Sequence, residues 1–135
     1  MLEGVPIISL WMPWANWVML GWKAVETRRH ARFASLAQKY IGIHAARKWD
    51  DTALDAARPY LTEEQIDATN DFPCEGGIII GTVWARYHRP LNAADSRAAL
   101  IDCGSVKRFG LTLEDPQIIE AIPAKGRQGI WYYRG

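Results

Sequence analysis

The sequence contains few cysteines and no long apolar run, and each absence excludes a class of protein. Cys74 and Cys103 are the only cysteines among 135 residues, and they have no metal-ligand spacing. We therefore expect free thiols in a reducing cytoplasm, with no metal and no cofactor, rather than a zinc module or a disulfide scaffold. No segment approaches the roughly 20 apolar residues that a membrane-spanning helix needs. Because the N-terminal segment also lacks the basic region of a secretory signal, we expect no membrane partner.

The chain has little net charge, but the charges are unevenly distributed. The formal total is +1. Residues 21–50 carry +5, residues 51–75 carry −6, and residues 76–135 carry +3. Two basic regions thus flank an acidic one, and a cleft lined by one sign of charge focuses a field that the net charge does not reveal. Chance clustering on solvated faces is the alternative.

Apolar patterning predicts a single domain over residues 1–135 with more strands than helices. A buried strand is expected over residues 5–10, followed by a buried helix over 14–20 that Gly21 ends. A helix over 51–58 and a second one that opens with the capping box of residues 62–65 make the acidic region helical. The remaining strands are expected over residues 22–28, 39–46, 77–87, 108–113 and 129–133. This order favours an α+β fold, a small, partly closed mixed β-barrel with short helices packed around it.

Tryptophan is the overrepresented residue, with seven copies. Trp11, Trp14 and Trp17 recur at helical spacing around the expected buried helix, which predicts core packing for all three. Trp22 and Trp49 lie beside basic residues and are better candidates for exposure.

Cations and flat side chains alternate along residues 22–48. A site for single-stranded nucleic acid needs cations for the phosphates and aromatic or imidazole rings for the bases. We therefore expect an RNA, nucleotide or nucleoside partner. The candidate binding residues are Trp22, Lys23, Arg28, Arg29, Arg32, His44, Arg47 and Lys48, joined from the C-terminal turn by Lys125, Arg127 and Gln128.

Three groups of segments resemble the ASCH domain family (activating signal cointegrator homology). Residues 8–15 (ISLWMPWA) precede residues 21–28 (GWKAVETR), which are similar to the family motif G-x-K-x-x-E-x-R. Residues 41–46 (IGIHAA) and 77–83 resemble two family strands, and residues 125–131 (KGRQGIW) resemble the closing segment. The resemblance implies a PUA-like barrel with an RNA- or nucleotide-binding cleft beside this motif.

The same resemblance leaves an enzymatic alternative open. Some relatives are hydrolases that cleave RNA or deacylate N4-acylated cytidine, and the lysine of the latter matches Lys23. Glu26 occupies the position of their nucleophilic threonine, whereas Thr27 is one residue further on. Lys23, Glu26 and His44 are the catalytic candidates, because a lysine of lowered pKa, a carboxylate and an imidazole can each move a proton.

Strand alternation makes a geometric prediction about these residues. On a strand over residues 22–28, Lys23 and Glu26 face opposite ways, whereas Glu26 and Arg28 share a face and can pair. Lys23 is then free to point into the cleft. A third possibility is a protein-interaction domain that contacts basic partners through the acidic residues 51–75. The oligomeric state cannot be inferred from the sequence.

Overall fold

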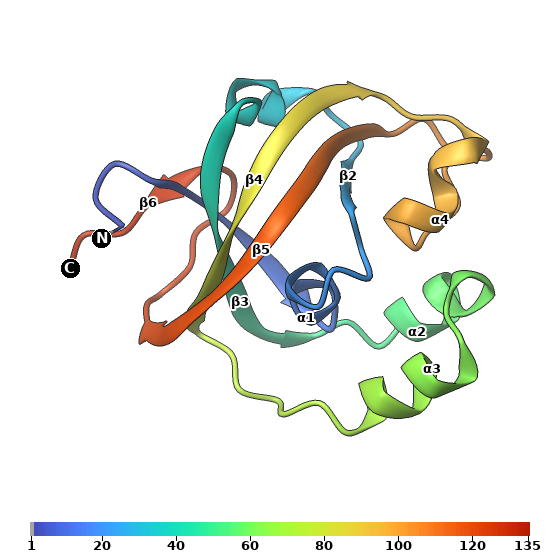
Figure 1. Ribbon diagram of the computed structural model, residues 1–135, viewed down its shortest axis with the longest axis horizontal. Coiled ribbons are helices and arrows are strands. Elements are labelled where there is room, and N and C mark those ends of the chain that lie inside the picture. Colours follow the sequence, from blue (N-terminus) through green and yellow to red (C-terminus); the bar gives the residue numbers. More distant parts are fainter. Residues whose placement is uncertain (1) are drawn as a thin grey trace.

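The computed structural model describes residues 2–135 and shows one curved sheet with short helices packed against it (Figure 1). The six strands are β1 (Pro6–Met12), β2 (Val25–Arg28), β3 (Lys39–Trp49), β4 (Ile78–Pro90), β5 (Phe109–Pro123) and β6 (Trp131–Tyr132). The α-helices are α1 (Trp14–Met19), α2 (Ala53–Ala57), α3 (Glu63–Asn70) and α4 (Ser96–Ala99). Three 3-10 turns complete the chain, η1 (Arg32–Leu36), η2 (Arg58–Tyr60) and η3 (Ala93–Asp95).

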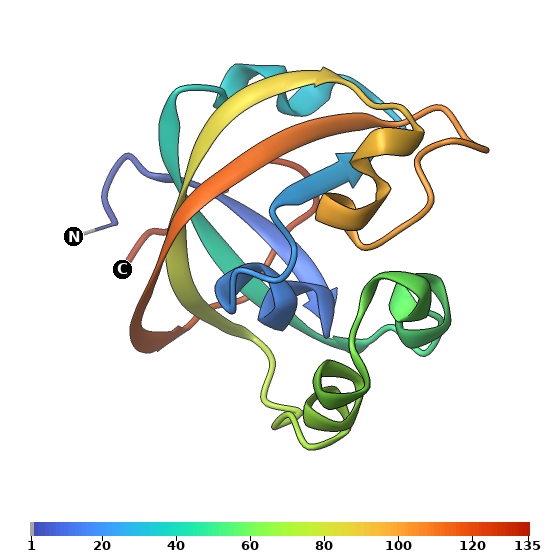
Figure 2. The same ribbon diagram turned by 45° about the vertical axis from the view of Figure 1, so that its right-hand side comes forward.

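The sheet is mixed and rolls up without closing. Its strand order is β2-β5-β4-β3-β1-β6, with β1 parallel to β3 and the other pairs antiparallel. Figures 1 and 2 show β4 and β5 curving along its length. Within residues 2–135 no backbone ladder joins β1 to β2, so an unpaired seam runs between these strands. The prediction of an α+β, partly closed barrel with short helices around it is confirmed.

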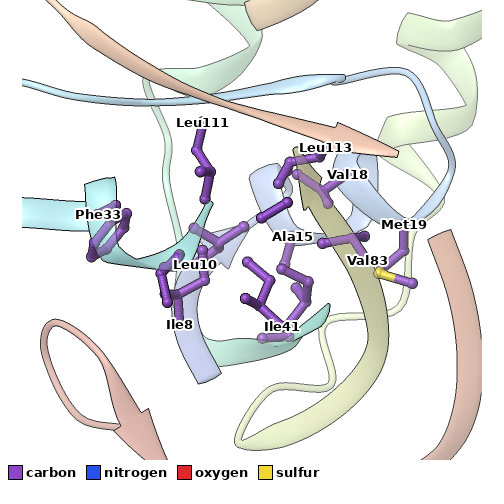
Figure 3. Close-up of a cluster of buried hydrophobic side chains, with 14 of the residues drawn as sticks. Ile8, Leu10, Ala15, Val18, Met19, Phe33, Ile41, Val83, Leu111 and Leu113 are labelled. Carbon is purple, nitrogen blue, oxygen red and sulfur yellow. The ribbon is translucent and has the colours of Figure 1, made fainter. Parts of the chain in front are cut away.

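The main core lies inside this curved sheet. Alternate residues of β1 point inward, with Ile8 and Leu10 almost fully buried, and Ile41 of β3 packs beside them (Figure 3). Helix α1 contributes Ala15 and Val18 to the same cluster, so the helix packs directly against the core of the barrel. The helix ends as expected at Gly21, whose φ of 78° is a conformation that glycine adopts without a steric penalty.

The acidic region is helical and packs against the other side of α1. Trp17 is fully buried beside Ala53 of α2. Its indole Nε1 donates to Thr69 Oγ1 of α3 at 3.0 Å. Thr62 and Gln65 form the predicted capping box at the start of α3. Helix α2 is shorter than expected.

Several predicted strand boundaries were wrong. Strand β5 continues to Pro123, well beyond residue 113, because its pairing with β4 resumes after irregularities in the register. Strand β1 reaches Met12, and β2 begins only at Val25. Both cysteines are free, Cys74 exposed and Cys103 buried. Among residues 2–135, none of the helices has the length and apolar character needed to cross a membrane.

Candidate functional site

A large cavity of about 1270 Å³ opens on the outer face of β1 and β3. One wall comes from these strands, a second from residues 28–33, and residues 123–130 form the third. Two of these segments are the basic regions recognised in the sequence. The fold therefore brings them together around one cavity.

All the carboxylates of the described residues lie outside the lining of this cavity, whereas five cationic side chains belong to it. These cations are Arg28, Arg32, Arg47, Lys125 and Arg127. All but Arg28 are exposed to solvent. The near-neutral chain therefore has one cavity with a strongly positive lining, which attracts anions.

His30 lies on the wall formed by residues 28–33, close to the cations Arg28 and Arg32. Its pKa lies below the usual value because its partial burial disfavours the charged form and because Arg32 and Arg28 repel a further positive charge. The backbone N–H of Arg32 donates to His30 Nδ1 at 3.1 Å, and the ring packs edge-on against Phe33. A neutral imidazole thus lies among cations on the cavity wall.

Trp11 is the exposed aromatic side chain of the cavity. It is 46% exposed, so the prediction that it packs in the core was wrong. The cause is the length of β1: Trp11 belongs to this strand, on the face opposite Leu10, and not to the helix. Lys48 Nζ lies 3.9 Å from the centroid of the indole ring, a cation–π contact that places another positive charge at the rim.

His44 lies at the floor of the large cavity and is almost completely buried. Burial lowers its pKa, and a hydrogen bond to the Ala124 carbonyl opposes that effect. Its ring packs edge-on against Trp131, with the centroids 5.3 Å apart. His44 therefore connects β3 to the C-terminal segment that forms the third wall.

A second, smaller cavity of about 340 Å³ occupies the seam between β1 and β2. Ser9, Trp11 and Arg28 line both cavities, so the two adjoin. The small cavity differs in charge, because Glu26 and Asp50 contribute to its lining.

Lys23 lines the small cavity and is buried, with an exposed fraction of 2%. Its Nζ donates to the Ala99 carbonyl at 2.5 Å and lies 4.9 Å from the Trp14 ring centroid. Nζ is also 3.9 Å from Glu26 Oε1, so the prediction that the two side chains face opposite ways was wrong. Strand alternation does not apply to Lys23, because β2 begins two residues later. Burial lowers its pKa from 10.5 to about 8, although Glu26 opposes this effect.

Glu26 also pairs with Arg28, as strand alternation predicted. Arg28 Nη2 lies 3.0 Å from Glu26 Oε2, which itself is nearly buried. Arg28 Nε is buried and has no hydrogen-bond partner within residues 2–135. Arg28 lines both cavities, and one of its N–H groups donates no hydrogen bond within residues 2–135.

Asp50 supplies the second carboxylate of the small cavity. Burial alone would raise its pKa, but hydrogen bonds from Trp14 Nε1 at 2.8 Å and from Thr52 outweigh this effect and hold the pKa below its usual value. Asp50 is consequently an ionised acceptor at neutral pH.

The predicted binding residues fall into three groups. Seven line the large cavity: Arg28, Arg32, His44, Arg47, Lys125, Arg127 and Gln128. Lys23 and Glu26 line the small cavity with Arg28. Trp22, Arg29 and Lys48 lie outside both linings, and Trp22 packs against Phe72 beside the helices. Lys23 lines the small cavity, whereas His44 and Lys125 line the large one, so these three residues do not share a cavity.

Sequence reasoning missed Ser9, Asp50 and the exposure of Trp11. Ser9 and Trp11 alternate with the apolar Ile8 and Leu10, so a strand extended by two residues would have placed them on one face. The small cavity also brings Thr27 to Lys23 and Glu26, which alternation along β2 did not predict.

The chain has an α+β, partly closed barrel fold with two adjoining cavities, and this fold is similar to that of ASCH proteins of known structure. No family model matches the sequence, and no curated protein matches it either. Among solved structures, the chain is similar to ASCH from Zymomonas mobilis, with 19% identity, a TM-score of 0.62, and coverage of 96% of this chain and 87% of that one.

Two variants of the Zymomonas mobilis protein give the same picture. A tyrosine-to-phenylalanine variant matches at 18% identity and a TM-score of 0.60, covering 96% of this chain and 89% of that one. A serine-to-alanine variant matches at 18% identity and a TM-score of 0.60, covering 98% and 90%. At this identity the likeness is one of fold, and the resemblance read from the sequence is confirmed at that level.

Proposed function

We propose that this protein binds single-stranded or structured RNA in the large cavity. The observation that carries the proposal is the lining of that cavity of about 1270 Å³. Among the described residues, five Lys and Arg side chains and no carboxylate belong to this lining, in a protein whose formal net charge is +1. Such a concentration of one sign of charge suits a ligand with several phosphates.

The aromatic side chains of the cavity support a nucleic acid over a simple anion. Trp11 is exposed at the boundary of the two cavities, and His30 lies on the wall formed by residues 28–33. Stacking of a base on an aromatic side chain contributes about 1–3 kcal/mol and tolerates any base. Phosphates held by the cations and a base on Trp11 account for both kinds of side chain.

Salt dependence tests the electrostatic part of the proposal. Each phosphate neutralised on a single strand contributes about −0.7 to the slope of log K against log salt, so five contacts lower the affinity about a hundredfold between 50 and 200 mM salt. We expect this dependence in fluorescence anisotropy titrations with a short single-stranded RNA. Absence of binding at low salt would contradict the proposal.

Charge-removal variants test the location. Arg127→Ala and Lys125→Ala should each weaken binding and make the salt slope shallower by about 0.7. The matched controls are Arg58→Ala and Lys39→Ala, exposed cations outside both cavities, which should leave both quantities almost unchanged. Equal losses in the controls would place binding elsewhere on the surface.

A second candidate function, a hydrolase acting on RNA or a modified nucleoside, rests on the small cavity. Burial lowers the pKa of Lys23 to about 8, and Glu26 and Thr27 line the same cavity. A lysine of lowered pKa can activate a hydroxyl group or water for attack on an acyl group. Turnover of N4-acetylcytidine, and separately of RNA, should occur with the wild type and be lost in Lys23→Met. Absent turnover excludes this candidate. Equal turnover in both proteins also excludes it, and with RNA as the substrate it indicates a contaminating nuclease.

A further inference from the structure

A chain of hydrogen bonds joins three segments at the floor of the large cavity. Ser9 Oγ of β1 lies 3.0 Å from His44 Nδ1 of β3. His44 Nε2 lies 2.8 Å from the backbone carbonyl oxygen of Ala124. The indole Nε1 of Trp131 donates to Ser9 Oγ at 3.0 Å.

The Ala124 carbonyl, at one end of this series of hydrogen bonds, determines which atoms of the series carry protons. The Ala124 carbonyl can only accept, so His44 Nε2 carries the proton. In the neutral imidazole Nδ1 is then unprotonated and accepts from the hydroxyl of Ser9. Because burial keeps the pKa of His44 below its usual value, this neutral form predominates at neutral pH. The Ser9 hydroxyl therefore directs its proton at a free base whose opposite nitrogen is held in place.

We propose that Ser9 and His44 form a nucleophile–base pair that hydrolyses esters carrying a negatively charged acyl group. A hydroxyl bonded to an imidazole, which a third group orients, is the arrangement that activates serine for attack on a carbonyl carbon. Here a backbone carbonyl orients the imidazole. The proposal goes beyond RNA binding and does not use Lys23 or Glu26.

The reaction proceeds in two steps, acylation of Ser9 and hydrolysis of the acyl-enzyme. The Ser9 proton moves to His44 Nδ1 as Oγ forms a bond to the acyl carbon, and the bond from that carbon to the alcohol oxygen breaks. The departing alcohol takes the proton from Nδ1. Water then attacks the acyl carbon and gives a proton to His44, and Ser9 Oγ leaves with that proton. The Trp131 N–H stabilises the negative charge that develops on Ser9 Oγ.

The surroundings of Ser9 select the charge of the substrate. Arg28 and Lys125 both line the large cavity with Ser9, Arg28 where it adjoins the small cavity and Lys125 on the facing loop. That loop lies directly against the pair: a Cβ on Gly126 would be only 2.6 Å from Ser9 Oγ. Within residues 2–135, the backbone N–H groups of Lys125 and Gly126 donate no hydrogen bond. Cations beside a nucleophile favour an acyl group that carries a carboxylate or phosphate.

Covalent labelling tests the nucleophile. Diisopropyl fluorophosphate reacts with activated serine, and peptide mass spectrometry locates the adduct. We expect label on Ser9 and none on Ser35, an exposed serine of η1 that serves as the internal control. We expect His44→Gln, which keeps an N–H for the Ala124 carbonyl but lacks a base, to slow labelling about a hundredfold. After subtraction of the uncatalysed rate, the p-nitrophenyl ester of 4-carboxybenzoic acid, whose carboxylate cannot reach its own ester, should be hydrolysed faster than p-nitrophenyl benzoate, and Ser9→Ala should abolish the difference.

A purely structural role for the network predicts different results. In that case Ser9 stays unlabelled, Ser9→Ala lowers only the thermal stability, and ester hydrolysis is unchanged, which would overturn the proposal. Ser9→Cys keeps the test valid if His44→Gln fails to fold. Its thiol should be alkylated by iodoacetamide faster than the exposed Cys74, and a slower reaction than that of Cys74 would likewise refute an activated position.

Discussion

Replacement of Lys23 by methionine should stabilise the protein at neutral pH. Lys23 is 2% exposed, and burial lowers the pKa of its ammonium group from 10.5 to about 8. At about 1.4 kcal/mol per pKa unit, the charged form costs about 3 kcal/mol in the folded state relative to the unfolded chain. Methionine fills a similar volume without the charge. It loses the hydrogen bond to the Ala99 carbonyl, which contributes about 1 kcal/mol. Glu26 keeps Arg28 as its partner.

The net expectation is a gain of about 2 kcal/mol at pH 7, or about 5–10 °C in Tm for a domain of this size. The gain should depend on pH. Since the pKa of Lys23 is lower in the folded state, the unfolded chain binds more protons between about pH 8 and pH 10.5, and the stability of the wild type rises through this window. Lys23→Met lacks this contribution, so its advantage should disappear by about pH 10.5.

Urea denaturation of both proteins at several pH values measures this difference directly, because the other titrating groups are common to both. Lys39→Met, which removes an exposed ammonium group, is the matched control and should change the free energy of unfolding by less than about 0.5 kcal/mol. Destabilisation by Lys23→Met at pH 7, or a difference independent of pH, would refute the reasoning.

Two further substitutions probe the loop over the large cavity and the acidic helices. Gly126→Ala places a Cβ 2.5 Å from His44 Cε1 and 2.6 Å from Ser9 Oγ, so it should lower the free energy of unfolding by about 1–3 kcal/mol and weaken RNA binding in anisotropy titrations. Unchanged stability and affinity would contradict this expectation and show that the loop moves away from His44 and Ser9 at little cost. Thr62→Ala removes the capping box of α3 and should cost about 1 kcal/mol in urea denaturation, whereas Thr62→Ser should cost little; equal effects would assign the loss to something other than the cap.

Local signals in the sequence predicted local structure well. The capping box at Thr62 and the glycine at position 21 both act within one helical turn, and both appear as expected. The barrel class was also predictable, because apolar β-branched runs need a shared core. Strand β5 was underestimated because Pro116 and Pro123 interrupt the strand pattern in the sequence. In the structure the irregularity is local, with a positive φ at Asp115 just before Pro116. Pairing with β4 nevertheless continues the strand, and such long-range pairing is not visible in the local sequence.

The sequence predicted that the site would be positively charged, but not that its residues would be divided between two cavities. Arg28, Lys125 and Arg127 meet around one cavity, as the two basic regions implied. Lys23 was expected in the same place but lies in the small cavity. The position of Lys23 was mispredicted because β2 begins at Val25 and not at residue 22. Lys23 therefore lies in irregular backbone before the strand, and its side chain reaches the Ala99 carbonyl. Side-chain direction is set by such boundaries, which sequence patterns locate poorly.

The unpaired seam between β1 and β2 has a consequence for how the barrel accommodates a guest. Elsewhere in the sheet, separating two strands breaks a series of backbone hydrogen bonds. Across the seam, within residues 2–135, no backbone ladder opposes separation and side chains alone do so, among them Trp11 and Arg28, two of the three residues shared by the cavities. The width of the opening is therefore set by a few exchangeable side chains rather than by the backbone. Substitutions at these positions can reshape the entrance while the hydrogen-bonded framework of the barrel stays intact.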